Sequence, residues 1–169
     1  METPLVDPNW HQLIESTGPV VYGVAWRILG HSQDAEDTVQ DVFLEVHRLW
    51  PGRQAQDWTA VLRRMAVCRA LDRLRQRRGR AAVDEIDVAE HRPGPAEIVA
   101  GRELASVLRD AIARLPNREA EIFCLRFFDE REYAEIAEAL DITTGAVGAA
   151  LHKARQRLEA MLLPMLTEK

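Results

Sequence analysis

The chain has 169 residues, of which 47% are hydrophobic and 29% charged, a composition typical of a globular soluble protein with one ordinary domain or two small ones. Its apolar runs are too short for a transmembrane helix, and no basic segment followed by an apolar one opens the chain, so we expect no signal peptide and a cytoplasmic location. Cys68 and Cys124 form no CxxC or Cys/His cluster, so the sequence predicts no disulfide framework, no metal site and no cofactor.

The net charge of −5 conceals an uneven distribution of charged side chains. Residues 1–60 hold nine acidic and three basic side chains, whereas residues 61–80 hold eight arginines and one aspartate. A second basic island, residues 152–169, holds four basic and two acidic side chains. Basic islands in an acidic chain are where a polyanion docks, although a solvated arginine-rich helix face remains the alternative.

Hydrophobic periodicity predicts helices along nearly the whole chain and therefore an all-α fold. In the first segment, Gly18-Pro19 predicts a break between two helical faces, and Gly30 ends the segment. A second helix is expected after Ser32, its predicted N-cap, and ends at Pro51-Gly52. A third is expected from about residue 57 to 78. Its inward-facing residues should be Val61, Leu62, Met65, Ala66, Leu71 and Leu74.

The helical pattern stops at residues 79–96, where glycine, prolines and acidic residues indicate an interdomain linker. It returns afterwards up to Pro116. The apolar positions of that returning helix are Ile98, Leu104, Leu108, Ile112 and Leu115. Two short helices at about 117–128 and 131–139 and a longer one at about 144–162 should follow. The sequence thus predicts two small helical domains, residues 1–78 and 97–169.

Residues 132–152 have the pattern of a helix-turn-helix. Ala137 is small enough to let the second helix approach, and Thr143 is placed to cap it. The residues expected to be buried are Ile136, Leu140, Val147, Leu151, Ala154 and Leu158. The opposite face of the second helix would enter a DNA major groove. A generic helical hairpin is the alternative.

Three aspartates, Asp34, Asp37 and Asp41, follow helical spacing and share one face, with Gln40 beside them. Such a face could suggest a metal site, but the Glu-x-x-His pairs of di-iron bundles are absent. An acidic surface that docks on a basic partner fits the pattern better.

The segment DAEDTVQDVFLEV, residues 34–46, resembles the DAED-x-x-Q-[ED]-x-F signature in region 2 of bacterial RNA polymerase sigma factors. The segment LPNREAEIFCLRFFDEREYAEIAEALDI, residues 115–142, followed by the helix-turn-helix, resembles sigma region 4. The two blocks in this order, with a short linker, resemble the extracytoplasmic-function (ECF) group of the sigma-70 family. The resemblance covers about residues 8–78 and 97–162. It implies a promoter-specificity subunit, not an enzyme, without a small-molecule substrate.

The resemblance also implies partners: the β′ clamp helices and β flap of core RNA polymerase, promoter DNA, and an anti-sigma factor as a further candidate. The residues that match the clamp-binding face are Asp34, Asp37, Gln40 and Asp41. Those implied for the −10 element are Trp50, Arg53, Trp58, Cys68, Arg69, Arg73, Arg75, Arg77 and Arg78; the two tryptophans could stack on a flipped base or serve in the core. Those implied for the −35 element are Thr143, Thr144, Gly145, Gly148, Ala149, His152, Lys153, Arg155 and Arg157.

Two departures from the family pattern matter. Cys68 stands where Asn is common, and because a thiol is a weak hydrogen-bond donor, base readout there is an open question, as is a redox role. Gly148, Ala149 and Ala150 stand where Lys, Ser and Arg are common, which predicts poor direct readout of bases. Two other functions stay open: a stand-alone helix-turn-helix regulator, and a metal-dependent helical enzyme.

Overall fold

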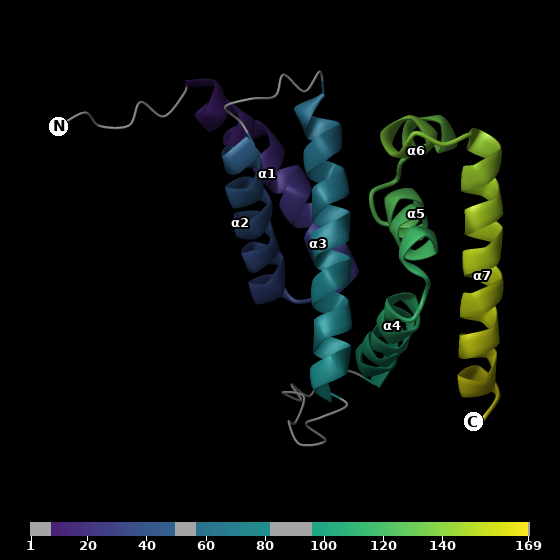
Figure 1. Cartoon of the computed structure of the whole chain (residues 1–169). Helices are drawn as coiled ribbons and strands as arrows, with labels where there is room; N and C mark the ends of the chain where they lie inside the picture. The colour runs from purple at the N-terminus through teal and green to yellow at the C-terminus, as the bar shows by residue number, and fades with distance from the viewer. Residues whose placement is uncertain (1–7, 50–56, 82–95, 169) are drawn as a thin grey trace. The chain divides into compact units, whose positions relative to one another are not determined.

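A computed structural model of the chain describes residues 8–49, 57–81 and 96–168, and within these ranges it contains seven α-helices and no β-strand (Figure 1). The all-α prediction is confirmed. No helix in the described ranges is both long and apolar enough to cross a bilayer. Trp50 and Arg53 lie outside the described residues, as does most of the predicted linker.

The chain divides into two compact units, residues 1–70 and 71–169. The first unit contains α1 (Pro8–Leu29), α2 (Ser32–Leu49) and the beginning of α3 (Trp58–Ala81). The second unit contains the end of α3 and four further helices. These are α4 (Ala96–Ala113), α5 (Asn117–Phe127), α6 (Tyr133–Leu140) and α7 (Thr144–Thr167).

The predicted break at Gly18-Pro19 is wrong, because α1 continues through Pro19. Proline removes one backbone hydrogen bond and its ring crowds the carbonyl four residues earlier, so another interaction must hold the helix together. The buried positions keep helical spacing on both sides of it: Trp10, Thr17, Val21, Val24 and Ile28. This continuous stripe packs against α2, and that packing outweighs the local cost of Pro19.

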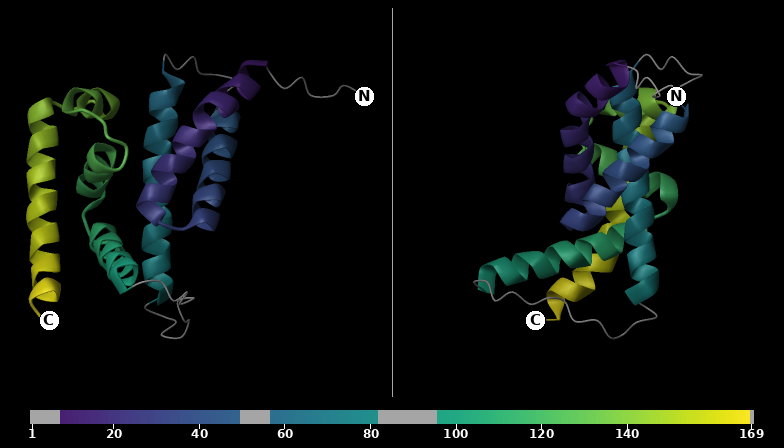
Figure 2. Two further views of the ribbon diagram at one scale, coloured as in Figure 1. Left: turned by 180° about the vertical axis from the view of Figure 1, so that it is seen from behind. Right: turned by 90° about the vertical axis from the view of Figure 1, so that its left-hand side faces the viewer.

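The hairpin between α1 and α2 turns at Gly30 and His31, and the two helices run antiparallel (Figures 1 and 2). Gly30 has a φ of 62°, a left-handed conformation that favours glycine. The predicted Ser32 cap is wrong by one residue: the Nδ1 atom of His31 accepts a hydrogen bond from the Asp34 N–H at 3.3 Å. The His31 carbonyl accepts the first bond of the helix, from Ala35.

The third helix follows its prediction with three differences. Leu62, Ala66, Leu71 and Leu74 are buried as expected, but Met65 is only half-buried, and Val61 is 36% exposed because it lies in the first turn of the helix. Other residues of this helix that the prediction did not include are buried, namely Val67 and Ala70. The helix also continues to Ala81, a little beyond its expected end.

In the second unit, α4, α5 and α6 all have contacts with other helices of the unit, and α7 packs against each of the three (Figure 1). The core of this unit includes Ile112, Leu115, Ile122, Ile136 and Leu151. Leu104, one of the apolar positions of the periodic pattern, is 52% exposed. The predicted helices at 117–128, 131–139 and 144–162 agree with α5, α6 and α7, although α7 extends through Pro164 to Thr167.

Candidate functional site

The acidic residues of α2 lie on its outward side. Gln40 and Asp41 are exposed, and Asp34 and Asp37 are half-buried, while Val42 on the other side is fully buried. The Gln33 side-chain amide donates a hydrogen bond to Asp37 Oδ1 at 3.2 Å. Within the described residues, no group of three or more His, Cys, Asp or Glu side chains is placed to hold a metal ion. The four residues predicted to bind the clamp helices, Asp34, Asp37, Gln40 and Asp41, thus lie together on the outward side of α2.

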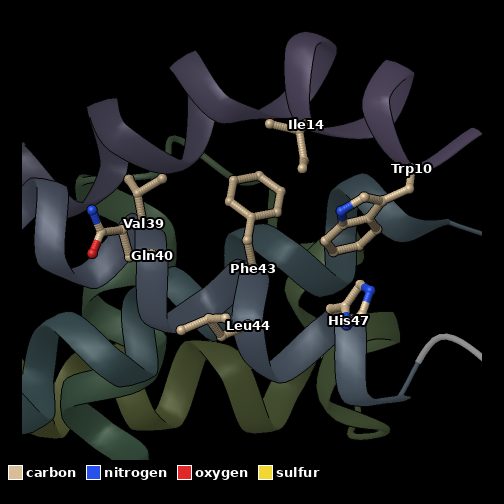
Figure 3. Close-up of a pocket in the computed structure, with 7 residues that line it drawn as sticks. All are labelled: Trp10, Ile14, Val39, Gln40, Phe43, Leu44 and His47. Carbon is tan, nitrogen blue, oxygen red and sulfur yellow. The ribbon is translucent and has the colours of Figure 1, made fainter. Parts of the chain in front are cut away.

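An apolar groove of about 530 Å³ adjoins this acidic surface, between α1 and α2 (Figure 3). It is lined by Trp10, Ile14, Val39, Gln40, Phe43, Leu44 and His47. Figure 3 shows the Phe43 ring reaching from α2 toward α1, with Ile14 and Trp10 on the α1 side. The Trp10 indole packs edge-on against Phe43, with 6.1 Å between ring centroids, which fixes one end of the groove.

The groove and the acidic residues form one continuous surface because Gln40 belongs to both. Leu44 is 59% exposed and Ile14 is 36% exposed, so apolar area that other parts of the unit do not cover lies next to Asp41 and Gln40. We call this combination of groove and acidic residues the α2 surface. An apolar centre with a polar rim is the composition of a protein–protein interface. The sequence did not predict the groove, because Trp10 and Ile14 come from another helix.

The arginines of α3 are not all held in the same way. Arg78 is exposed, whereas Arg73 and Arg77 are half-buried. Arg69 donates from Nε to Glu45 Oε2 at 2.9 Å, an ion pair between α3 and α2 whose two side chains are 41% and 38% exposed. Nothing in the sequence signals this pair, because the two residues lie 24 positions apart.

Within the second unit, Arg75 donates hydrogen bonds to the backbone carbonyls of Ala113 and Leu115, at 3.4 and 3.3 Å. Burial and, to a lesser degree, the positive charge of Arg77 lower the pKa of Arg109 below its usual value.

The two remaining residues predicted for the −10 element and seen in the structure are Trp58 and Cys68. Trp58 is the first residue of α3 and is half-buried, so it is neither a core residue nor fully available for stacking. Cys68 is half-buried, whereas Cys124 is fully buried, and the two cysteines do not form a disulfide.

The helix-turn-helix forms as predicted from α6 and α7. Glu132 and Glu135 cap the start of α6 reciprocally, and the Glu132 N–H donates to Glu135 Oε2 at 2.8 Å. Asp141 ends α6 with a φ of 53°, a conformation that aspartate tolerates better than most residues. The Thr143 hydroxyl accepts from the Ala146 N–H at 3.1 Å, which confirms the predicted cap of α7. The predicted core residues of both helices are buried: Ile136, Ala137, Leu140, Val147, Leu151, Ala154 and Leu158.

The outward face of α7 carries small residues at its start. Helical periodicity places Gly145, Ala149 and His152 opposite the buried stripe of Val147, Leu151 and Ala154, with Gly148 on its flank. Gly145, Ala149 and His152 are exposed, as are Thr143, Thr144 and Lys153. Gly148 is half-buried, and a Cβ atom on it would lie 3.7 Å from the Tyr133 ring. Gln156 is also exposed, one turn after His152, although no sequence motif points to it.

Arg155 and Arg157 of α7 both interact with α5. The Arg155 guanidinium lies over the Phe127 ring, 5.2 Å from its centroid. Arg157 Nε is 2.9 Å from Glu119 Oε2, a close charge pair in which the N–H does not point at that oxygen as a hydrogen bond requires. Sequence reasoning missed both partners, since Phe127 and Glu119 are distant in the chain and carry no motif of their own.

Comparison with known families identifies the two regions of the chain that carry these surfaces. Residues 13–80 match the family described as Sigma-70 region 2, and residues 106–158 match the family described as Sigma-70, region 4. Together the two matches cover more than half of the chain. The first contains α2 with its acidic residues and most of α3, and the second contains the helix-turn-helix.

Two relatives extend this agreement over most of the chain. The ECF RNA polymerase sigma factor SigE of Mycolicibacterium smegmatis is 29% identical over 160 residues, which cover 92% of this chain. The chain spans only 62% of that relative's length. The ECF RNA polymerase sigma factor SigW of Bacillus subtilis is 27% identical over 157 residues, covering 84% of this chain and 82% of the relative.

A solved structure has the same fold. The sigma factor RpoE of Bartonella quintana, in complex with the anti-sigma factor NepR, matches with a TM-score of 0.53 over 95% of this chain and 99% of that chain. Its sequence identity of 16% makes this a likeness of fold alone. From the two matched regions and the relatives, this chain belongs to the sigma-70 family of bacterial RNA polymerase sigma factors, in the ECF group.

Proposed function

We propose that this chain is a sigma subunit that binds core RNA polymerase and directs it to specific promoters, without a catalytic activity of its own. The observation that carries the proposal is the presence, in one chain and in sigma order, of the acidic α2 surface, the arginine-rich α3 and the helix-turn-helix of α6 and α7. Such a subunit acts where polymerase and DNA are, in the cytoplasm. No other proposed function uses all three features.

Core polymerase is proposed to dock on the α2 surface. The carboxylates of Asp37 and Asp41 attract a basic partner and set its orientation, while the groove beside Gln40 offers apolar area to bury. Charge alone gives mainly a fast encounter, and the apolar groove supports a long-lived complex. The two properties together suit a subunit that must stay bound while promoter DNA is located.

Promoter DNA is proposed to meet both units. The arginines of α3, with Trp58 and Cys68, are assigned to the −10 element, and the start of α7 to the −35 element. Each phosphate contact from Arg78 or its neighbours adds affinity that falls as salt rises. Opening the −10 element also requires that a base leave the duplex, which costs a few kcal/mol unless stacking replaces the lost contacts.

The charge of α6 argues against the alternative of a stand-alone DNA-binding regulator. The exposed acidic residues around it are Glu132, Glu135, Glu138 and Asp141. The first helix of a helix-turn-helix crosses the DNA backbone, where acidic side chains repel phosphates. Arg126 and Arg131 lie 3.6 and 3.8 Å from Glu132 and Glu135 and offset part of this charge. The remaining acidic charge favours a partner, such as core polymerase, that holds the unit on DNA.

Regulation by an anti-sigma factor is part of the proposal. Support comes from the Bartonella quintana sigma factor of the same fold, which was solved with its anti-sigma factor bound. A regulator of this class would compete with core polymerase for the surfaces described above.

The test combines association and transcription. The purified chain is mixed with core polymerase, co-elution is measured, and run-off transcription is then followed on genomic fragments. The expected result is a stable complex that starts transcripts at defined positions that core polymerase alone does not use. A chain that fails to join core polymerase but binds duplex DNA as a dimer would establish the regulator instead.

A further inference from the structure

We infer that Gln156, together with His152, reads base edges in the −35 element, so that the sequence-specific contacts of α7 lie about three turns into the helix. The inference rests on the proposed function and names the side chains that would make this DNA contact specific. It moves base readout away from the start of the helix, where glycine and alanine can read little.

The outward side of α7 carries one straight row of residues. The Thr143 cap fixes where the helix begins, and the buried Val147 and Leu151 fix the side that packs inward. At roughly 100° per residue, steps of four, three and four positions keep a row on the opposite side. In a helix-turn-helix this side of the second helix faces the major groove. The row consists of Gly145, Ala149, His152 and Gln156, and all four are exposed.

His152 and Gln156 are the members of this row that have hydrogen-bonding side chains. Among the residues that the structure describes, neither side chain has a hydrogen-bond or ion-pair partner. Arg155 and Arg157 of the same helix differ, because their charged groups already contact α5. The two side chains in the row are therefore available to bind DNA.

The two threonines at the start of α7 are less suited to reading bases. The Thr143 hydroxyl accepts a hydrogen bond from the Ala146 N–H, which commits it to capping the helix. Thr144 is exposed, but it lies roughly 100° around the helix from Gly145 and so outside the row.

Cations lie on both flanks of the row. Lys153 and Arg155 are exposed and lie roughly 80° from the row on opposite sides. The Phe127 ring of α5 holds the Arg155 guanidinium on its flank. Contacts from these two cations to phosphates would position the row over the bases between them. Glu159, exposed one turn after Gln156, repels phosphates and marks the end of the part that faces DNA.

The spacing of the two side chains predicts which base pairs they read. Residues four positions apart are about 6 Å apart along the helix axis, close to the roughly 7 Å of two base-pair steps. Glutamine binds adenine bidentately, and an imidazole N–H donates to the acceptors of guanine. We expect two steep positions about two base pairs apart, each with roughly 5- to 150-fold discrimination, and adenine preferred opposite Gln156.

The experiment uses the full chain in complex with core polymerase, on a promoter found by run-off transcription. Each base pair of the −35 element is substituted in turn, and promoter affinity is measured at one fixed salt concentration. The variant Gln156→Ala should abolish discrimination at one steep position and leave the other, and His152→Ala should do the reverse. Because both residues are exposed and alanine favours helix, these variants should fold normally.

Two further variants sharpen the test. Gln156→Arg should change the preferred base at its position from adenine to guanine, because arginine binds guanine bidentately. The matched control is Lys153→Ala, at an exposed residue of the same helix turns that lies off the row. It should weaken binding by about the same factor for every sequence, since a phosphate contact does not distinguish bases.

The outcomes separate the inference from the proposed function. Loss of discrimination at a single position in Gln156→Ala, with the new preference in Gln156→Arg, supports the inference. A scan that is unchanged in Gln156→Ala, or affinity lowered equally for all sequences, would overturn it and leave the sigma function intact. Failure to form a complex with core polymerase would overturn the proposed function, and the inference with it.

Discussion

The outward surfaces of α2 and α7 are opposites in chemistry, although both belong to amphipathic helices with a fully buried stripe. α2 presents carboxylates, an amide and large apolar side chains such as Leu44, whereas the start of α7 presents glycine and alanine. A surface of polar and large apolar side chains can make many specific contacts with a partner, whereas a surface of glycine and alanine can make few. The contrast agrees with the proposed roles, in which α2 offers many side chains to core polymerase and the start of α7 offers few to the −35 element.

The largest effect is expected from charge reversal on α2. The double variant Asp37→Lys and Asp41→Lys places like charges against a basic partner, which costs several kcal/mol and should weaken core binding by at least about 100-fold. Affinity for core polymerase, measured by titration, checks this. The matched control reverses two exposed glutamates of the second unit, Glu103→Lys and Glu159→Lys, and should leave core affinity nearly unchanged. Core binding by the α2 variant at natural strength would contradict the docking assignment.

A smaller loss is expected from the groove itself. Leu44→Asp removes apolar area and adds a charge where an apolar partner would be buried, so core binding should fall by about tenfold or more. Because Leu44 is 59% exposed, the free energy of unfolding should change by less than about 0.5 kcal/mol. The control Leu163→Asp, at a residue of α7 that is 50% exposed, should have no effect on core binding. An equal loss in both variants would mean that the groove has no specific role.

The ion pair between α2 and α3 offers a more sensitive comparison. Glu45→Gln removes the negative charge that holds Arg69, so promoter affinity should rise a few-fold and become more dependent on salt, by a slope of about one if one phosphate contact is gained. The pair is partly exposed, and its loss should cost no more than about 1 kcal/mol of stability. Unchanged affinity over a salt series would show that Arg69 serves only to join the two helices.

The smallest and most uniform effect is expected in the middle of α7, where the charged groups of Arg155 and Arg157 already contact Phe127 and Glu119. Replacing both arginines with alanine should weaken DNA binding only a little and by about the same factor for every DNA sequence, because contacts with phosphates do not distinguish bases. Affinity for several −35 sequences measured in parallel checks this. A loss confined to some sequences would assign one of the two arginines to base readout after all.

Local signals allowed much of the fold to be predicted. The helix-turn-helix was correct to the individual cap, because Thr143 and the spacing of Val147 and Leu151 are properties of a short segment. The prediction failed at Pro19, where packing along the whole of α1 outweighs a local breaker. Leu104 shows a second limit, since periodicity identifies an apolar position but cannot establish that a neighbouring helix covers it.

In the candidate site too, features that lie within one helix could be predicted, and features that need two helices could not. The carboxylates of α2 could be assigned to one surface from spacing alone, because they belong to one helix. The groove beside them could not, because it needs Trp10 and Ile14 from α1. The partners of Arg69 and Arg157 could not be predicted from the sequence either, since tertiary packing alone brings Glu45 and Glu119 to them.

The unequal burial of the two cysteines allows one of them, Cys68, to be labelled selectively as a probe of α3. Cys124 is fully buried, so a mild alkylating reagent should modify Cys68 first and leave Cys124 protected while the chain stays folded. A fluorophore attached in this way would sit on α3 without any engineered residue. The rate at which Cys68 is labelled can be compared between the free chain, the polymerase complex and the complex on promoter DNA. A slower rate would show that α3 has become covered.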